Sequence, residues 1–294
     1  MNAAFVIDKE GTLVEFRGVK RKFQVVRNGK TVSNIELWDK EGAPQVTVPG
    51  TVKHIKYGAF NQCHNLRTVF LNEGTETIQM FAFDGTALKD LWVPQESLRW
   101  CSLYAFPSKE SVTLHVTYVK GAWPALRRAG YVLHKLPMDL REAHSGLFQC
   151  LLMARQQFNV NLHVRYKNDV SDKEFIGMPP CTVTFHDDIC SKYLFRHSRV
   201  DRVVLDKGVD YVDPDAFRSD GEPYFDDTDI NRIDVSSGNA AFYSLDGILF
   251  NAKHDLLVFP HAKQVPGGCY QVPSGTRQIV PGAFDGCFNV EKLV

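Results

Sequence analysis

The hydrophobic positions of the chain recur with a period of 22 or 23 residues. A dipeptide of alanine and phenylalanine recurs at steps of 23 residues as Ala59-Phe60, Ala82-Phe83 and Ala105-Phe106. Apolar residues with the spacing L-x-x-L-x-L occur at a step of 22 residues, first as Leu66, Val69 and Leu71 and then as Leu88, Leu91 and Val93. A unit of this length cannot bury its apolar face alone, so we expect the units to stack and share a continuous core.

This period predicts a β-rich α/β repeat solenoid. A repeat in the low twenties is typical of leucine-rich repeats, which contribute one strand and one turn or short helix per unit. We therefore expect a right-handed leucine-rich-repeat solenoid, with the short helices and turns on its convex side. The repeats are predicted over residues 43–136 and again over 181–294.

Residues 1–42 are predicted to form an N-terminal β cap over the first repeat. Two pairs of apolar, alternating runs flank Lys9-Glu10-Gly11 and Asn28-Gly29. Asn-Gly between such runs is a strong hairpin signal, because both residues tolerate positive φ. A solenoid end needs such a cover, since it would otherwise expose its core. Asp246-Gly247 predicts a further hairpin within the later repeats.

Residues 137–180 interrupt the period. Asp139 and Glu142 have the spacing of a capping box, and the apolar residues that follow lie on one helical face. We expect an amphipathic helix of about five turns, followed by a strand over NLHVRY. The block is interpreted as an insertion or a degenerate repeat, and a small separate domain is the alternative.

Three segments resemble the BspA-type leucine-rich repeats of bacteria. They are AFNQCHNLRTVFL, GAFDGCFNVEKLV and NAAFYSLDGILFN, and the resemblance extends over roughly 43–120 and 195–294. It implies a β-rich, curved solenoid that binds proteins or surfaces without a cofactor or catalytic residues. The sequence differs from the family in two respects. The repeat pattern does not explain the block at 137–180, and we see no leader or wall-anchoring signal.

Charge and cysteine content narrow the function classes. The chain has 34 basic and 34 acidic residues and a pI near 7.1, which argues against binding to nucleic acid or a membrane surface. No stretch approaches the roughly 18 apolar residues of a membrane span. The seven cysteines lack tight paired spacing, which favours reduced thiols and a cytoplasmic location. A surface or secreted protein whose leader has been removed is the alternative.

Cysteines and histidines provide the candidates for chemistry. Cys63 and Cys287 occupy the same repeat position and are expected to be buried small hydrophobes. Residues of the types that bind zinc occur at irregular spacing, as Cys181, His186 and Cys190. The competing interpretation is that Asp187 and Asp188 cap a turn in which Leu194-Phe195 replaces Ala-Phe.

A cysteine nucleophile is the remaining catalytic possibility. Cys150 and His144 would lie on the predicted helix, about one and a half turns apart, but this pairing is a weak signal. We therefore expect a non-enzymatic module that binds a protein or peptide and holds no cofactor or metal. An enzyme or metal protein with its site in the 137–190 block is the alternative.

The candidate binding surface is a row of residues on the predicted sheet. Because side chains alternate along a strand, Phe70 should point away from the core residues Val69 and Leu71. Applying the same register to neighbouring repeats gives the outward row Thr47, Phe70, Trp92 and His115. A solvent-facing aromatic row favours partner binding, unless the N-terminal cap or the 137–180 block covers it. The strand expected at 270–294 would offer an apolar edge for self-association.

Overall fold

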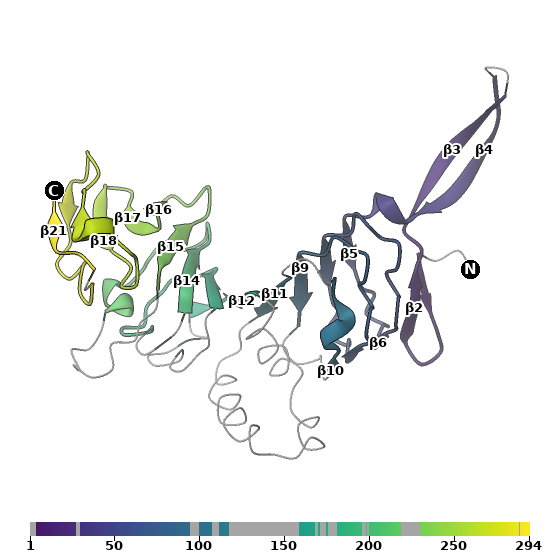
Figure 1. The fold of residues 1–294 in the computed structure, drawn as a ribbon, viewed down its shortest axis with the longest axis horizontal. Coiled ribbons are helices and arrows are strands. Elements are labelled where there is room, and N and C mark those ends of the chain that lie inside the picture. Colours follow the sequence, from purple (N-terminus) through teal and green to yellow (C-terminus); the bar gives the residue numbers. More distant parts are fainter. Residues whose placement is uncertain are drawn as a thin grey trace, which may run out of the picture. The chain divides into compact units, whose positions relative to one another are not determined.

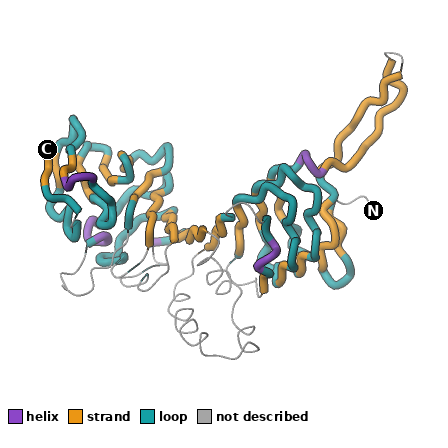
Figure 2. The backbone as a smooth tube through the Cα atoms, in the orientation of Figure 1, coloured by secondary structure: helices purple, strands orange, loops and turns teal. Residues whose placement is uncertain are grey.

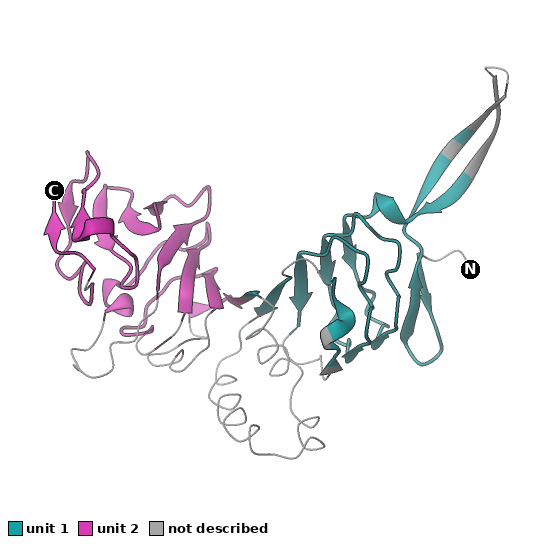
Figure 3. Ribbon diagram, in the orientation of Figure 1, with its two compact units in different colours: residues 1–116, 136–159 teal, residues 117–135, 160–294 magenta. Residues whose placement is uncertain are grey.

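The computed structural model divides the chain into two compact units (Figures 1 and 3). Unit 1 comprises residues 1–116 and 136–159, and unit 2 comprises 117–135 and 160–294. The structure describes residues 4–27, 30–94, 100–107, 112–117, 159–167, 170, 175, 181–195, 198, 200–218, 230–287 and 289–294. The predicted helix of the 137–180 block, with His144 and Cys150, lies outside the described residues.

Two hairpins form at the N-terminus, as the turn signals predict. Their strands are β1 (Phe5–Ile7), β2 (Thr12–Phe16), β3 (Val19–Arg27) and β4 (Lys30–Asp39). Strand β2 also pairs in parallel with the first repeat, through Thr12 against His54 and Leu13 against Ile55. In the described part of the chain, β3 and β4 pair only with each other. The first hairpin therefore extends the first repeat by one strand, while the second forms a separate ribbon.

Unit 1 is built from two parallel ladders that face each other across the core. One consists of β5 (Gln45–Thr47), β7 (Thr68–Phe70), β9 (Asp90–Val93) and β11 (Thr113–Thr117). The other continues from β2 through β6 (His54–Ile55), β8 (Thr77–Ile78) and β10 (Trp100–Cys101). Each repeat contributes one short strand to each ladder, which is why the hydrophobic pattern has two apolar segments per period.

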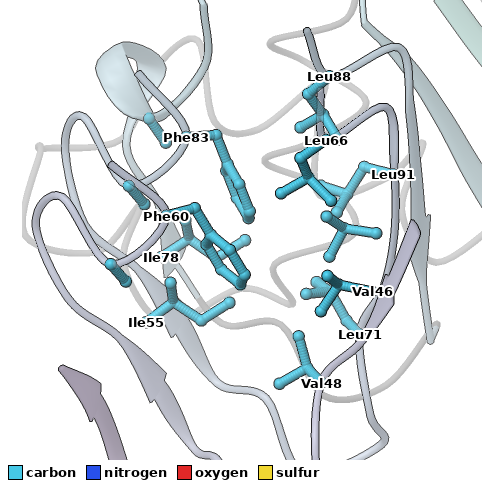
Figure 4. Close-up of a cluster of buried hydrophobic side chains, with 14 of the residues drawn as sticks. Val46, Val48, Ile55, Phe60, Leu66, Leu71, Ile78, Phe83, Leu88 and Leu91 are labelled. Atoms are coloured by element: carbon cyan, nitrogen blue, oxygen red, sulfur yellow. The ribbon is translucent and has the colours of Figure 1, made fainter. Parts of the chain in front are cut away.

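The core of unit 1 is a column of phenylalanines packed against aliphatic side chains (Figure 4). The rings of Phe60 and Phe83 are stacked with centroids 4.9 Å apart, and those of Phe83 and Phe106 with centroids 5.8 Å apart. The alanine before each phenylalanine is fully buried, as its small side chain allows neighbouring turns to approach closely. Burying one phenylalanine side chain of this column stabilises the fold by about 1.5–3 kcal/mol.

Unit 2 begins with a parallel ladder and ends in mixed pairing. The parallel strands are β12 (Asn159–Val164), β13 (Cys181–Phe185), β14 (Val200–Leu205) and β15 (Arg232–Val235). The later strands are β16 (Phe242–Leu245), β17 (Ile248–Asn251), β18 (Asp255–Val258), β19 (Cys269–Tyr270), β20 (Gln278–Ile279) and β21 (Lys292–Leu293). The predicted hairpin at Asp246-Gly247 is confirmed, and both turn residues have positive φ.

The helices of the described residues are single 3-10 turns (Figure 2). They are η1 (Lys40–Gly42), η2 (Leu103–Ala105), η4 (Pro214–Phe217) and η5 (Pro266–Gly268). Ser102 and Asp213 cap two of them by accepting a hydrogen bond from a backbone N–H two residues later. The expected β-rich solenoid with few helices is therefore confirmed. Among the described helices, none has the length and apolar character to span a membrane.

Asparagine side chains connect successive turns. The Nδ2 of Asn72 donates to the carbonyls of Pro49 and Val52 at 2.7 and 3.0 Å, in the preceding turn, and its Oδ1 accepts from Gly74 N–H at 2.6 Å. In unit 2, the Nδ2 of Asn239 donates in the same way to two carbonyls, both at 2.9 Å. These amides satisfy backbone groups that the short strands leave without a ladder partner.

Candidate functional site

The outward row predicted on the β5–β11 ladder is in register. Thr47 lies opposite Phe70, Phe70 opposite Trp92, and Trp92 opposite His115. The rings of Phe70 and Trp92 are stacked with centroids 5.7 Å apart and an interplanar angle of 18°. The rings of Trp92 and His115 are closer, at 4.4 Å and 9°. We call these four residues the aromatic sheet row.

Strand alternation separates this row from the core. The neighbours Val69 and Leu91 are buried, whereas Thr47 is exposed and the three rings are half-buried. The rings cover one another's faces, so each presents mainly an edge away from the sheet. The register and the orientation expected from the sequence are therefore confirmed, while binding through the row stays a prediction.

A polar row accompanies the aromatic one on the same face. The residues two positions earlier in the four strands are Gln45, Thr68, Asp90 and Thr113, and they pair in the same order. The His115 Nε2 lies 2.9 Å from the Asp90 Oδ1, which fixes the imidazole over Trp92. The face thus combines aromatic edges with hydroxyl, amide and carboxylate groups.

Comparison with known families identifies the repeat type. Residues 36–118 match six copies of the BspA type Leucine rich repeat region. Residues 36–118 are BspA-type leucine-rich repeats. Their matched range includes all four strands that hold the aromatic sheet row. A search of curated proteins gives no match.

Solved structures of bacterial proteins resemble the chain at low sequence identity. A leucine-rich repeat protein from Eubacterium ventriosum is 19% identical with a TM-score of 0.28, and the match covers 87% of this chain and 48% of that one. The pneumococcal vaccine antigen PcpA is 18% identical with a TM-score of 0.28, and the match covers 87% of this chain and 47% of that one. A leucine rich cell surface protein from Faecalibacterium prausnitzii is 14% identical with a TM-score of 0.35, and the match covers 98% of this chain and 67% of that one. This chain spans about half the length of the first two.

The possible metal ligands predicted in unit 2 do not converge. Cys181 begins β13 and is buried, and burial raises the pKa of its thiol to about 12. His186 follows the end of that strand, roughly 16 Å away at the rise of an extended chain, and Cys190 is exposed. No group of three His, Cys, Asp or Glu within the described ranges is placed to hold a metal ion.

The two aspartates beside these residues serve the backbone instead. Asp187 accepts hydrogen bonds from the N–H groups of Asp188 and Lys167, which lower the pKa of its carboxyl. Asp188 accepts from the N–H groups of Asp210 and Tyr211, in the next repeat. The Leu194 and Phe195 side chains that follow are fully buried. This arrangement agrees with the turn-capping interpretation.

A histidine chain in unit 2 was not predicted. His163 is buried on β12, and its Nδ1 lies 2.9 Å from the Nε2 of His186. The His186 Nδ1 lies 2.8 Å from the Asp206 Oδ2. Burial opposes ionisation of Asp206, but the Lys207 N–H and His186 outweigh it and lower the pKa of this carboxyl. The 23-residue step from His163 to His186 was the available signal in the sequence. The two contacts orient both imidazole rings across neighbouring repeats.

The two cysteines at one repeat position differ in burial. Cys63 is fully buried, as expected, and burial raises the pKa of its thiol to about 11. Cys287 is only half-buried, so the expectation for it was wrong. It packs at the margin of the second core cluster, where its Sγ lies 3.4 Å from the Phe259 carbonyl. Burial depends on what packs over a residue, and a shared repeat position does not specify this.

Proposed function

We propose that the protein is a non-enzymatic binding module whose protein or peptide partner contacts the aromatic sheet row. The observation that carries the proposal is the in-register stack of Phe70, Trp92 and His115 on one strand ladder. The three rings lie outside the core cluster of unit 1, which holds the buried phenylalanine column. Aromatic side chains dominate the free energy of many protein interfaces.

The geometry favours a polypeptide over a small molecule. The row extends across four strands that are about 4.8 Å apart, so it spans roughly 14 Å. The parallel polar row provides hydrogen-bonding groups along the same length, including the Asp90 carboxylate, and His115 stays fixed between Asp90 and Trp92. A long, shallow face with alternating aromatic and polar rows matches an extended chain or a protein edge.

The test compares Trp92→Ala with a matched tryptophan change outside the row. Partners are captured from native lysate with the wild-type protein, identified, and titrated by calorimetry against each variant. Removing the central ring should weaken binding by about 2 kcal/mol, or roughly thirtyfold, whereas Trp38→Ala on β4 should bind as the wild type does.

Stability must be measured for both variants in the same buffer. A loss of affinity at Trp92 without a loss of folded protein supports the proposal. Equal affinity of Trp92→Ala and the wild type for every captured partner would rule out the row as the binding surface.

A further inference from the structure

A pocket of about 670 Å³ lies in unit 1, where the ribbon of β3 and β4 leaves the first repeat (Figure 1). Its volume is within the roughly 300–1,000 Å³ that is usual for small-molecule sites, and it is open to solvent. Three segments line it, namely the end of β2, the junction of β4 with η1, and the turn that follows Phe60. The wall consists of charged side chains, one glutamine and one indole, and it includes no residue of the aromatic sheet row.

The Glu15 carboxylate lies between two cations of the pocket wall. The Lys40 Nζ is 3.3 Å from its Oε1, and the Arg17 Nε is 3.5 Å from its Oε2. Lys40 is held in this position because its ammonium also donates to the Asn61 carbonyl at 3.2 Å. Donors and acceptors of hydrogen bonds therefore lie side by side along this wall.

The two other carboxylates of the wall also have partners. The Asp39 Oδ2 is 2.8 Å from the Arg21 Nε, and its Oδ1 accepts from the Glu41 N–H at 3.0 Å. The His64 Nδ1 donates to the Gly85 carbonyl at 2.9 Å, so its Nε2 faces the Glu41 Oε1 at 3.9 Å. An ion entering the pocket would have to displace one of these partners. The pairing therefore favours an uncharged ligand.

A carboxylate beside an ammonium is matched by a hydroxyl group. A hydroxyl donates and accepts through the same oxygen, so it can contact Glu15 and Lys40 together. In a trans peptide the N–H and the C=O point in opposite directions, so one peptide group cannot meet both. The wall therefore suits an uncharged molecule that carries several hydroxyls.

Trp38 adds an apolar surface to this polar wall. The Lys20 Nζ lies 5.4 Å from the centroid of its ring, and Lys20 does not line the pocket, so the ammonium contacts the indole from outside. Aromatic side chains offer a large, flat apolar area. A pyranose ring with equatorial hydroxyls matches it, because the axial C–H bonds of such a ring form an apolar face.

Gln62 occupies a glycine position in the wall of the pocket. Its φ is +66°, and the residues at the same place in other repeats are Gly85, with φ +71°, and Gly286, with φ +75°. A residue with a Cβ is strained in this left-handed region, and strained residues gather at functional sites. Folding alone would favour glycine here, whereas glutamine brings an amide with both donors and an acceptor to the pocket.

We propose that this pocket binds a saccharide built of pyranose units with equatorial hydroxyls. The hydroxyls contact the paired groups of Glu15 and Lys40 and the Gln62 amide, and one face of a sugar ring packs on Trp38. The site is separate from the aromatic sheet row, and the proposal does not rest on protein binding by that row.

The test is saturation-transfer NMR of cellobiose and of N,N′-diacetylchitobiose with the full chain. The wild type should transfer magnetisation to at least one of them, most strongly to its axial ring protons, and Trp38→Ala should abolish the transfer. Gln62→Gly should weaken binding about tenfold, while its urea midpoint stays the same or rises because glycine fits the local φ. Tyr211→Ser is the control, since Tyr211 is an exposed tyrosine of unit 2 outside the pocket.

Three reference compounds separate a saccharide site from other sites. Mannitol has hydroxyls but no ring and should show no transfer, and neither sulfate nor choline at equal concentration should displace the disaccharide. Absence of transfer from both disaccharides at millimolar concentration would overturn the proposal. Equal transfer from mannitol, displacement by either ion, or wild-type affinity of Gln62→Gly would also overturn it. Trp38→Ala should keep its affinity for a partner of the aromatic sheet row, so the two proposals can fail separately.

Discussion

Removal of the Asn72 amide tests how the repeats are connected. Asn72→Ala deletes two hydrogen bonds, of 2.7 and 3.0 Å, to the carbonyls of Pro49 and Val52, and a third, of 2.6 Å, from the Gly74 N–H. Gly74 is exposed, so water replaces that third partner. The two carbonyl contacts are partly buried and decide the size of the effect.

A hydrogen bond of this kind contributes about 0.5–1.5 kcal/mol net, and a buried group left without a partner costs more. Asn72→Ala should therefore lower the free energy of unfolding by about 1–3 kcal/mol. Asn72→Asp should be at least as harmful, because it keeps the acceptor for Gly74 but turns a carboxylate oxygen toward two carbonyls. Asn65→Ala is the control, since Asn65 is exposed and makes one contact, of 3.3 Å, with a carbonyl.

The assay is urea unfolding followed by tryptophan fluorescence, supported by thermal melting. A change of about 2 kcal/mol should lower the Tm by roughly 4–8 °C, while Asn65→Ala should stay within about 0.5 kcal/mol of the wild type. If Asn72→Asp unfolds at the wild-type urea concentration, the donor contacts do not hold the turns together and the reasoning fails.

Three further perturbations have defined outcomes. Cys63→Ser should destabilise the fold by about 1–3 kcal/mol through a buried hydroxyl, and Cys287→Ser by less; rapid labelling of Cys63 in the native protein would contradict this. Two hydrogen bonds of 2.7 Å from Arg277 lower the pKa of Asp255 below its unfolded value, so this pair stabilises the fold above about pH 4 and the contribution is lost as the pH falls further. Asp255→Asn should flatten the acid dependence of the urea midpoint between pH 7 and 3, and equal slopes for both proteins would be inconsistent with it. Leu293 is 44% exposed on β21, which pairs only with β19 among the described strands, so the chain should self-associate at high concentration and Leu293→Lys should prevent it; a wild-type monomer in sedimentation would exclude this contact.

The repeat, the hairpins and the sheet register could be read from the sequence because each depends on local spacing. Residues one period apart pair directly, as Trp92 and His115 do, so counting along the chain placed the aromatic sheet row. The contact between the rings of Tyr57 and Phe81, whose centroids are 5.7 Å apart, could not be found this way. Tyr57 lies one position before Gly58, whereas Phe81 occupies the position that matches Gly58. Aligning the repeats separates two side chains that the fold brings together.

The histidine chain eluded sequence reasoning for a related reason. Asp206 follows His186 by 20 residues rather than by a full repeat. Strands β13 and β14 pair at the same step of 20 residues from Thr182 to Phe185, so this repeat is shorter than those of unit 1. Such an irregularity leaves no signature in the hydrophobic pattern, because Val200, Val203 and Leu205 are buried as the regular repeat predicts.

The phenylalanine column of unit 1 allows the chain to change its length by whole repeats. Each phenylalanine ring packs on the ring one repeat away, so neighbouring repeats offer each other the same packing surface. Excising residues 60–82 would bring Phe83 to the place of Phe60, with the following strands still in phase. A difference of one residue is absorbed between the strands, because Val69 pairs with Leu91 at a step of 22 residues and Leu91 pairs with Leu114 at a step of 23. Loss or gain of one repeat would therefore shorten or lengthen the sheet face by one strand, while the packing between the remaining repeats stays the same.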